Sequence, residues 1–148
     1  MSKVLKIGIS KNFGNEIQIQ SLNEVQAIKG KRLINGKHFK KNNEARCQIT
    51  LIEIENINYY NKISGTTIPT ISFRRNIITE SIKLNELVGR EFFIGKIRVK
   101  AHDLCRPCKY LQESLKRKNL VIELLRKAGL RCEILSSGKI YINDQIKY

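Results

Sequence analysis

Apolar and polar residues alternate with a period of two along much of the chain, which is the pattern of half-buried β-strands. The alternation is clearest at residues 17–20 and 97–101. Runs rich in β-branched residues at 4–9, 25–28 and 48–54 also favour strands. Because turn residues interrupt such segments about every 8–12 positions, the pattern predicts a mainly β protein with a β-barrel architecture.

Two segments depart from this alternation and are predicted to be helical. Residues 55–63 follow the densest β-forming run and are interpreted as a short helix closed by Gly65. One long helix is predicted from Lys109 to about Lys127, because its apolar residues lie three, four or seven positions apart and charged residues occupy the opposite side. These apolar residues are Leu111, Leu115, Ile122 and Leu125. Gly129 then ends the helix.

The C-terminal segment is predicted to be a β-hairpin. Two strand-like runs, 131–135 and 140–142, flank a turn that contains Gly138. No internal repeat, linker or low-complexity run divides the chain, so we interpret residues 1–148 as one domain. The apolar runs are far shorter than the roughly 18–20 residues that span a bilayer, and the N-terminus lacks the apolar core of a signal peptide. We therefore expect a cytoplasmic protein with no membrane partner.

The composition adds a strongly basic character. The chain carries 28 Lys and Arg residues against 13 Asp and Glu residues, a formal net charge of +15. The positive electrostatic field of such a protein favours anionic partners, but the basic residues are spread over the whole chain. Aromatic residues make up only 7% and do not interleave with basic residues as base-stacking surfaces require. We keep a basic nucleic-acid-binding barrel as an alternative because of the charge. Because of the aromatic pattern, nucleic acid is not the partner that we expect.

The cysteines carry the candidate chemistry. Cys47 and Cys132 stand alone in strand-like segments and are interpreted as small buried apolar residues. Cys105 and Cys108 form a C-R-P-C motif just ahead of the long predicted helix. Cys108 falls in the first helical turn, where free backbone N–H groups, the helix dipole and the neighbouring Arg106 all stabilise a thiolate. We therefore predict that Cys108 is the functional thiolate and that Cys105 has a secondary role.

A thiolate at this place suits several chemistries. Structural zinc would need two more ligands at suitable spacing, and neither His38 nor His102 stands in such a pattern. A thiol–disulfide oxidoreductase using Cys105 and Cys108 is an alternative, since C-x-P-C at the start of a helix is similar to thioredoxin-type proteins. However, no proline follows Pro107 to serve as the cis-proline of such an active site. A sulfur carrier and a soft-metal ligand also remain.

Three segments together resemble the MOSC domain, which is found in molybdenum cofactor sulfurases and in small stand-alone bacterial proteins. They are R-R-N-I at 74–77, L-N-E-L-V-G-R-E-F-F-I-G at 84–95 and P-C-K-Y-L at 107–111. Weaker similarity extends over 30–39, 48–53 and 129–144, so the resemblance covers roughly the whole chain. It implies a β-barrel of the pyruvate-kinase-barrel-like kind.

The resemblance also implies a molybdenum–pterin group, the molybdenum cofactor built on molybdopterin. In relatives the cysteine after the proline, here Cys108, either ligates molybdenum or carries sulfur. The R-x-N-I motif approaches the cofactor's phosphate, which gives Arg74, Arg75 and Asn76 that role here, with Arg106 beside them. Paired guanidinium groups next to an amide suit a bidentate anion clamp.

Two functions are compatible with this family. One is a sulfur carrier in cofactor maturation, and the other is a molybdenum-dependent reductase of N-hydroxylated compounds. No flavin, iron–sulfur or pyridoxal-phosphate domain is recognised in the sequence, so we expect a partner, either a desulfurase or an electron donor. The chain departs from the family at Lys37, where an acidic residue is expected. Gly89 and Gly95 are interpreted as turn residues, because no glycine-rich phosphate loop occurs.

Overall fold

The computed structural model describes residues 2–13, 16–31, 33, 48–65, 67, 75–105 and 127–148. Within these residues the protein is mainly β, as the sequence predicts, with an eight-stranded sheet, a two-stranded sheet and one α-helix. The long helix predicted over residues 109–127 lies outside the described residues, except for its last position. No helix in the described part of the chain is long and apolar enough to cross a membrane.

The strands of the larger sheet are β1 (Lys3–Phe13), β2 (Glu16–Leu22), β4 (Ile49–Glu53), β5 (Ile77–Glu80), β6 (Glu91–Ile94), β7 (Ile97–Leu104), β8 (Leu130–Ile134) and β10 (Ile146–Lys147). The smaller sheet pairs β3 (Glu24–Ala27) with β9 (Gly138–Tyr141), and the helices are α1 (Ile54–Ser64) and the 3-10 helix η3 (Leu84–Leu87). In the larger sheet the strand order is β10-β6-β7-β8-β4-β5-β1-β2. These strands match most of the segments that alternation along the sequence predicts.

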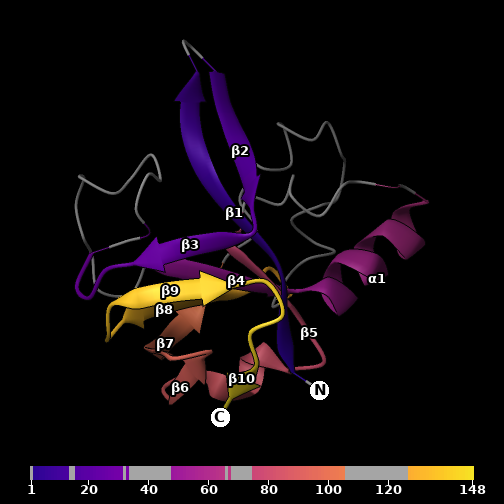
Figure 1. Cartoon of the computed structure of the whole chain (residues 1–148). Helices are drawn as coiled ribbons and strands as arrows, with labels where there is room; N and C mark the ends of the chain where they lie inside the picture. The colour runs from indigo at the N-terminus through magenta and orange to yellow at the C-terminus, as the bar shows by residue number, and fades with distance from the viewer. Residues whose placement is uncertain are drawn as a thin grey trace.

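The larger sheet curls into a half-barrel, with the paired ends of β1 and β2 rising from it at the top of Figure 1. Its described strand pairs are antiparallel except for β4 and β5, which run parallel and are connected through α1. At the opposite end from that β1–β2 ribbon, the first residues of β1 meet the segment before β10. There Val4 N–H donates to Asp144 O (2.9 Å) and Ile146 N–H donates to Ser2 O (2.9 Å). The two termini are therefore neighbours (Figure 1).

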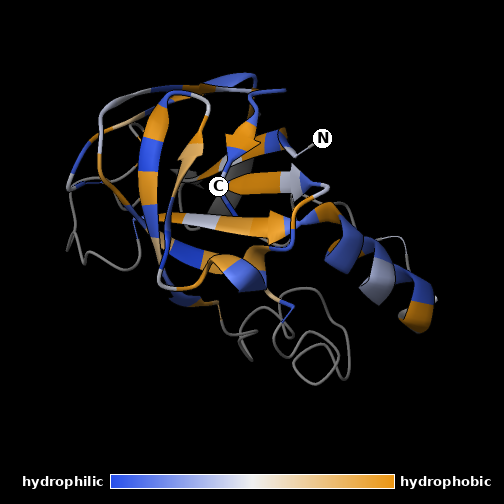
Figure 2. Cartoon of the chain, turned by 90° about the horizontal axis from the view of Figure 1, so that it is seen from below, coloured by the Kyte–Doolittle hydropathy of each residue, from blue (hydrophilic) through white to orange (hydrophobic). Residues whose placement is uncertain are grey.

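One large apolar core collects side chains from both sheets. It forms because every second residue of a strand points to the same face, as in β8, where Leu130, Cys132 and Ile134 are buried and the residues between them are half-exposed. Figure 2 shows this alternation of hydrophobic and hydrophilic residues along the strands. The pattern that predicts the strands is thus also the pattern that builds the core.

Helix α1 covers the outer face of β4 and β5, so these two strands are buried on both faces. Leu51 belongs to the main core, while the next residue, Ile52, packs with Ile57 and Tyr60 of α1 in a second cluster. This two-sided burial explains the dense apolar run of β4, because a parallel strand covered on both faces has no polar side. The helix ends at Gly65 with φ of 66°, which confirms the short helix predicted here.

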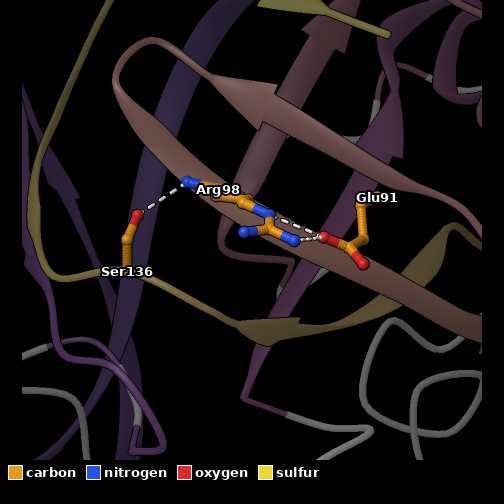
Figure 3. A network of polar contacts seen from close by, with 3 residues as sticks. All are labelled: Glu91, Arg98 and Ser136. Carbon is orange, nitrogen blue, oxygen red and sulfur yellow. Dashed lines mark hydrogen bonds and ion pairs between the residues drawn. The ribbon is translucent and has the colours of Figure 1, made fainter.

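The predicted C-terminal hairpin is wrong in its pairing. Both segments are strands, but β8 bonds to β4 and β7 while β9 bonds to β3. Because both edges of β8 are occupied, the chain crosses to the smaller sheet after this strand. Two serines hold the crossing: Ser136 Oγ accepts the N–H of Arg98 (2.9 Å), and Ser137 Oγ accepts the N–H of Lys29 (2.8 Å). Figure 3 shows the first contact, with the Arg98 guanidinium paired to Glu91.

The turn assignments of two glycines are confirmed. Gly89 lies in a turn with φ of 81°, and Gly95 lies in a turn with φ of 59°. Gly95 and Lys96 form the two-residue connection between β6 and β7, which pair as an antiparallel hairpin. Both glycines therefore allow the backbone to turn with a positive φ.

Candidate functional site

The candidate site begins at Arg75, the second arginine of the R-R-N-I segment. Arg75 lies two residues before β5 and is half-buried. Its Nε donates a hydrogen bond to the carbonyl oxygen of Ala128 at 2.8 Å. Within the described part of the chain, its two terminal amino groups make no hydrogen bond. A guanidinium anchored through Nε keeps these groups as a fixed pair of donors, the geometry that suits a phosphate.

The next residue, Asn76, uses its side chain to join three strands. Its Oδ1 accepts hydrogen bonds from the backbone N–H (3.0 Å) and the hydroxyl (3.2 Å) of Thr50 in β4, and its Nδ2 donates to Gly8 O in β1 (3.1 Å). Its backbone N–H also donates to Thr50 Oγ1 (3.1 Å). An amide nitrogen carries two hydrogens, so one donor of Asn76 is left after these contacts. Asn76 therefore fixes the position from which Arg75 extends.

Cys105 and Arg75 donate hydrogen bonds to the carbonyl groups of two consecutive residues, 129 and 128. The backbone N–H of Cys105, just after β7, donates to Gly129 O at 2.7 Å, while Arg75 binds the carbonyl of the preceding residue, Ala128. Cys105 is buried, with 5% of its surface exposed. The structure thus brings the arginine motif and the first cysteine of the C-R-P-C motif to one place, although they are far apart in the sequence.

Gly129 makes this junction possible. It has φ of 110°, and a Cβ at this position would lie 2.0 Å from the carbonyl oxygen of Leu51 in β4. Only glycine allows the backbone to pass that close to β4. The sequence indicated Gly129 only as the end of a helix, and Thr50 only as part of a strand. The sequence could not indicate that Ala128 binds Arg75, because Ala128 does so through its backbone carbonyl group.

The two described cysteines differ in their surroundings. Cys132 lies in the main core, which confirms its interpretation as a small buried apolar residue. Burial raises the pKa of the Cys132 thiol well above its ordinary value, and Cys105 and Asp103 raise it further. Cys132 is therefore a neutral thiol at physiological pH and a poor nucleophile.

The remaining candidate residues are divided between the described and the undescribed parts of the chain. His102 in β7 places its Nε2 2.9 Å from Glu133 Oε1 in β8, so this histidine contacts a neighbouring strand. Close to Cys105, Arg131 Nε donates to Asp103 Oδ1 (3.0 Å). The residues Lys37, His38, Cys47, Arg74, Arg106 and Cys108 lie outside the described residues. The site as described therefore consists of Arg75, Asn76 and Cys105 around residues 128–129.

Solved structures with the same fold are found over essentially the whole chain. The YuaD protein of Bacillus subtilis superposes with a TM-score of 0.80 at 19% identity, covering 100% of this chain and 97% of that one. YiiM of Geobacillus stearothermophilus gives 0.77 at 14% identity, covering 99% and 74%, and YiiM of Escherichia coli gives 0.74 at 13% identity, covering 99% and 69%. At these identities the likeness establishes the fold.

A comparison with curated protein sequences found no match. The family model described as "MOSC domain" matches residues 36–147, which is most of the chain and includes every segment of the candidate site except Gly8. The chain belongs to the MOSC domain family.

Proposed function

We propose that this MOSC domain binds a molybdenum–pterin cofactor, with the phosphate at Arg75 and Asn76 and the metal side at the thiolate of Cys108. The observation that supports this proposal is the junction at residues 128–129. There Arg75 and Cys105 donate hydrogen bonds to consecutive carbonyl groups. Two motifs that the family resemblance assigns to one cofactor therefore start from the same place. Because three residues span at most about 11 Å, Cys108 is expected within that reach of Cys105.

The donor groups at the junction fit the phosphate end of such a cofactor. Arg75 contributes a pair of terminal amino groups that the described protein leaves unbonded, and Asn76 contributes one remaining amide hydrogen. Arginine binds phosphate through two parallel N–H···O bonds, which are among the stronger hydrogen bonds in proteins. Arg74 and Arg106 are expected to add positive charge.

When bound, the molybdenum centre supplies either electron exchange with a substrate or a site for a transferable sulfur atom. The protein's own part is to orient the group and to present a soft sulfur ligand. Cys132 is unsuited to this role, because it is a neutral thiol inside the core. Cys105 is held by its backbone and is buried, so we assign the reactive role to Cys108 and a supporting role to Cys105.

The test is to express the protein in a host that makes molybdopterin and to measure bound molybdenum by elemental analysis and bound pterin by fluorescence. Arg75→Gln should weaken pterin retention by about 1.5–3 kcal/mol, the scale of a hydrogen bond to a charged group. Arg98→Gln is the matched control, because Arg98 pairs with Glu91 on an exposed surface. Equal pterin content in the Arg75 and Arg98 variants would overturn the phosphate assignment.

The cysteine assignment has its own test. Cys108→Ser should lose molybdenum and the fast-alkylating thiol, whereas Cys105→Ser should keep both. The reverse result would transfer the role to Cys105. The two family functions are then separated by their partners: labelled sulfur transferred from a cysteine desulfurase to Cys108 supports the carrier, and turnover of an N-hydroxylated amidine with a reduced electron donor supports the reductase.

A further inference from the structure

A cavity lies at the opposite end of β5 from Arg75 and Asn76. Its volume is about 610 Å³, and it lies between the end of β4, the start of α1, residues 81–90 and Tyr148. Asn76 comes just before β5 and Ser81 just after it, so the length of a four-residue strand, about 13 Å, separates the two places. The cavity is in the size range of small-molecule sites, and the proposed cofactor site does not use it.

Two side chains of this cavity, Glu53 and Glu55, carry carboxylates that interact electrostatically with each other. Glu53 Oε2 accepts a hydrogen bond from Asn56 Nδ2 (3.2 Å), and Glu55 Oε2 accepts one from the backbone N–H of Ser81 (3.1 Å). In the described part of the chain, no Lys or Arg nitrogen lies within 4 Å of either carboxylate. Burial raises the pKa of the Glu53 carboxyl, and the neighbouring Glu55 adds to this rise. Hydrogen bonds from Leu84 N–H and Asn56 and the positive charge of Lys127 oppose it only in part. A positively charged group between them would relieve this repulsion.

The same cavity also presents cations and apolar surface. Lys83 and Arg90 line it, and neither makes an ion pair with the described residues. Ile82 and Leu87 are buried residues of the lining, and Tyr148, which also lines the cavity, is 73% exposed. The cavity therefore offers anionic, cationic and apolar contacts within one small volume.

This combination selects the charge type of a ligand. A purely cationic molecule would be repelled by a protein of net charge +15, and a purely anionic one would meet the glutamates of the lining, which include Glu86. A zwitterion has little net charge and satisfies both kinds of group at short range.

We propose that this cavity is a binding site for a small zwitterionic amine of the α-amino acid class. The ammonium group of the ligand lies at Glu53 and Glu55, its carboxylate at Lys83 and Arg90, and its side chain against the apolar part of the lining. The site is distinct from the proposed cofactor site and does not depend on cofactor binding.

The test is a titration of the ¹⁵N-labelled protein with each of the twenty standard L-amino acids, followed by amide chemical shifts. At least one amino acid should saturate at about 10 mM or below, with the shifts centred on residues 53–55 and 81–90. Removal of either the amino or the carboxylate group from the best ligand should weaken binding by about tenfold or more. No saturation by any amino acid, or equal binding of a one-charge analogue, would overturn the proposal.

Variants give a second, independent measurement. Glu55→Gln and Arg90→Gln should each weaken binding of the best amino acid by about tenfold. Glu24→Gln and Lys96→Gln are the matched controls, because both residues are exposed and lie outside the cavity. Thermal unfolding and the amide spectrum verify that each variant is folded. Unchanged affinity in folded Glu55 and Arg90 variants would place the ligand elsewhere and refute the site.

Discussion

Replacement of Gly129 by alanine should be among the most damaging single-methyl changes in this protein. The new Cβ would lie 2.0 Å from the carbonyl oxygen of Leu51 and 3.3 Å from Cβ of Ile52, at a φ of 110°. A left-handed backbone costs a non-glycine residue about 1–2 kcal/mol. The overlap with a backbone atom cannot be relieved by a side-chain rotation, so the strand must shift, which costs about 1–3 kcal/mol more. We expect a total loss of about 2–5 kcal/mol.

Urea unfolding followed by circular dichroism measures this loss. Gly65→Ala is the matched control, because Gly65 also has a positive φ, of 66°, but a Cβ there meets nothing within 4 Å. The control should lose only the backbone cost of about 1 kcal/mol. Equal losses in the two variants would refute the close approach of residue 129 to β4. The carbonyls of residues 128 and 129 hold Arg75 and Cys105, so Gly129→Ala should also lower pterin retention.

Three further predictions concern single side chains. Asn76→Ala should lower the unfolding free energy by about 2–4 kcal/mol, because it leaves Thr50 N–H and Gly8 O without their side-chain partner; a loss below about 1 kcal/mol would contradict this. Cys132 should resist iodoacetamide in the folded protein up to pH 9 and react in urea, as read by peptide mass spectrometry, and native labelling would refute its burial. Because folding raises the pKa of Glu53, its ionisation opposes folding as the pH rises above the ordinary value of 4.5. Glu53→Gln should therefore gain stability relative to wild type with rising pH, and a constant difference in urea titrations across that range would count against it.

Much of the fold can be predicted from local pattern. The alternation at residues 97–101 locates β7, the strand-like run at 131–135 locates β8, and the segment 55–63, closed by Gly65, locates α1. These predictions succeed because the period of buried residues directly reflects strand or helix geometry. The parallel pairing of β4 with β5 was not predicted. The only sign of this pairing in the sequence is the dense run of apolar residues in β4. The half-barrel is observed, and a closed barrel remains a prediction.

The candidate site is predictable in part. The family resemblance names Arg75 and Asn76, the C-R-P-C motif names Cys105, and the structure brings the three residues to one junction. It also gives Asn76 a second role, the joining of β1, β4 and β5, which no motif indicates. Backbone carbonyl groups such as that of Ala128 belong to every residue type, so a sequence cannot mark the few that hold a functional side chain.

The sequence by itself determined most of the segments that are strands, the face of those strands that is buried, and the residue types that carry the chemistry. The tertiary structure alone decided which strands share an edge. The segments that become β8 and β9 carry the alternation and turn residues of a hairpin, yet β8 pairs with β4 and β7, and β9 pairs with β3. The physical reason is that alternation is a property of side chains, which point to the faces of a sheet. The edges are lined by backbone N–H and C=O groups that are nearly the same for every residue, so only the competition among all strands for those edges selects the partners.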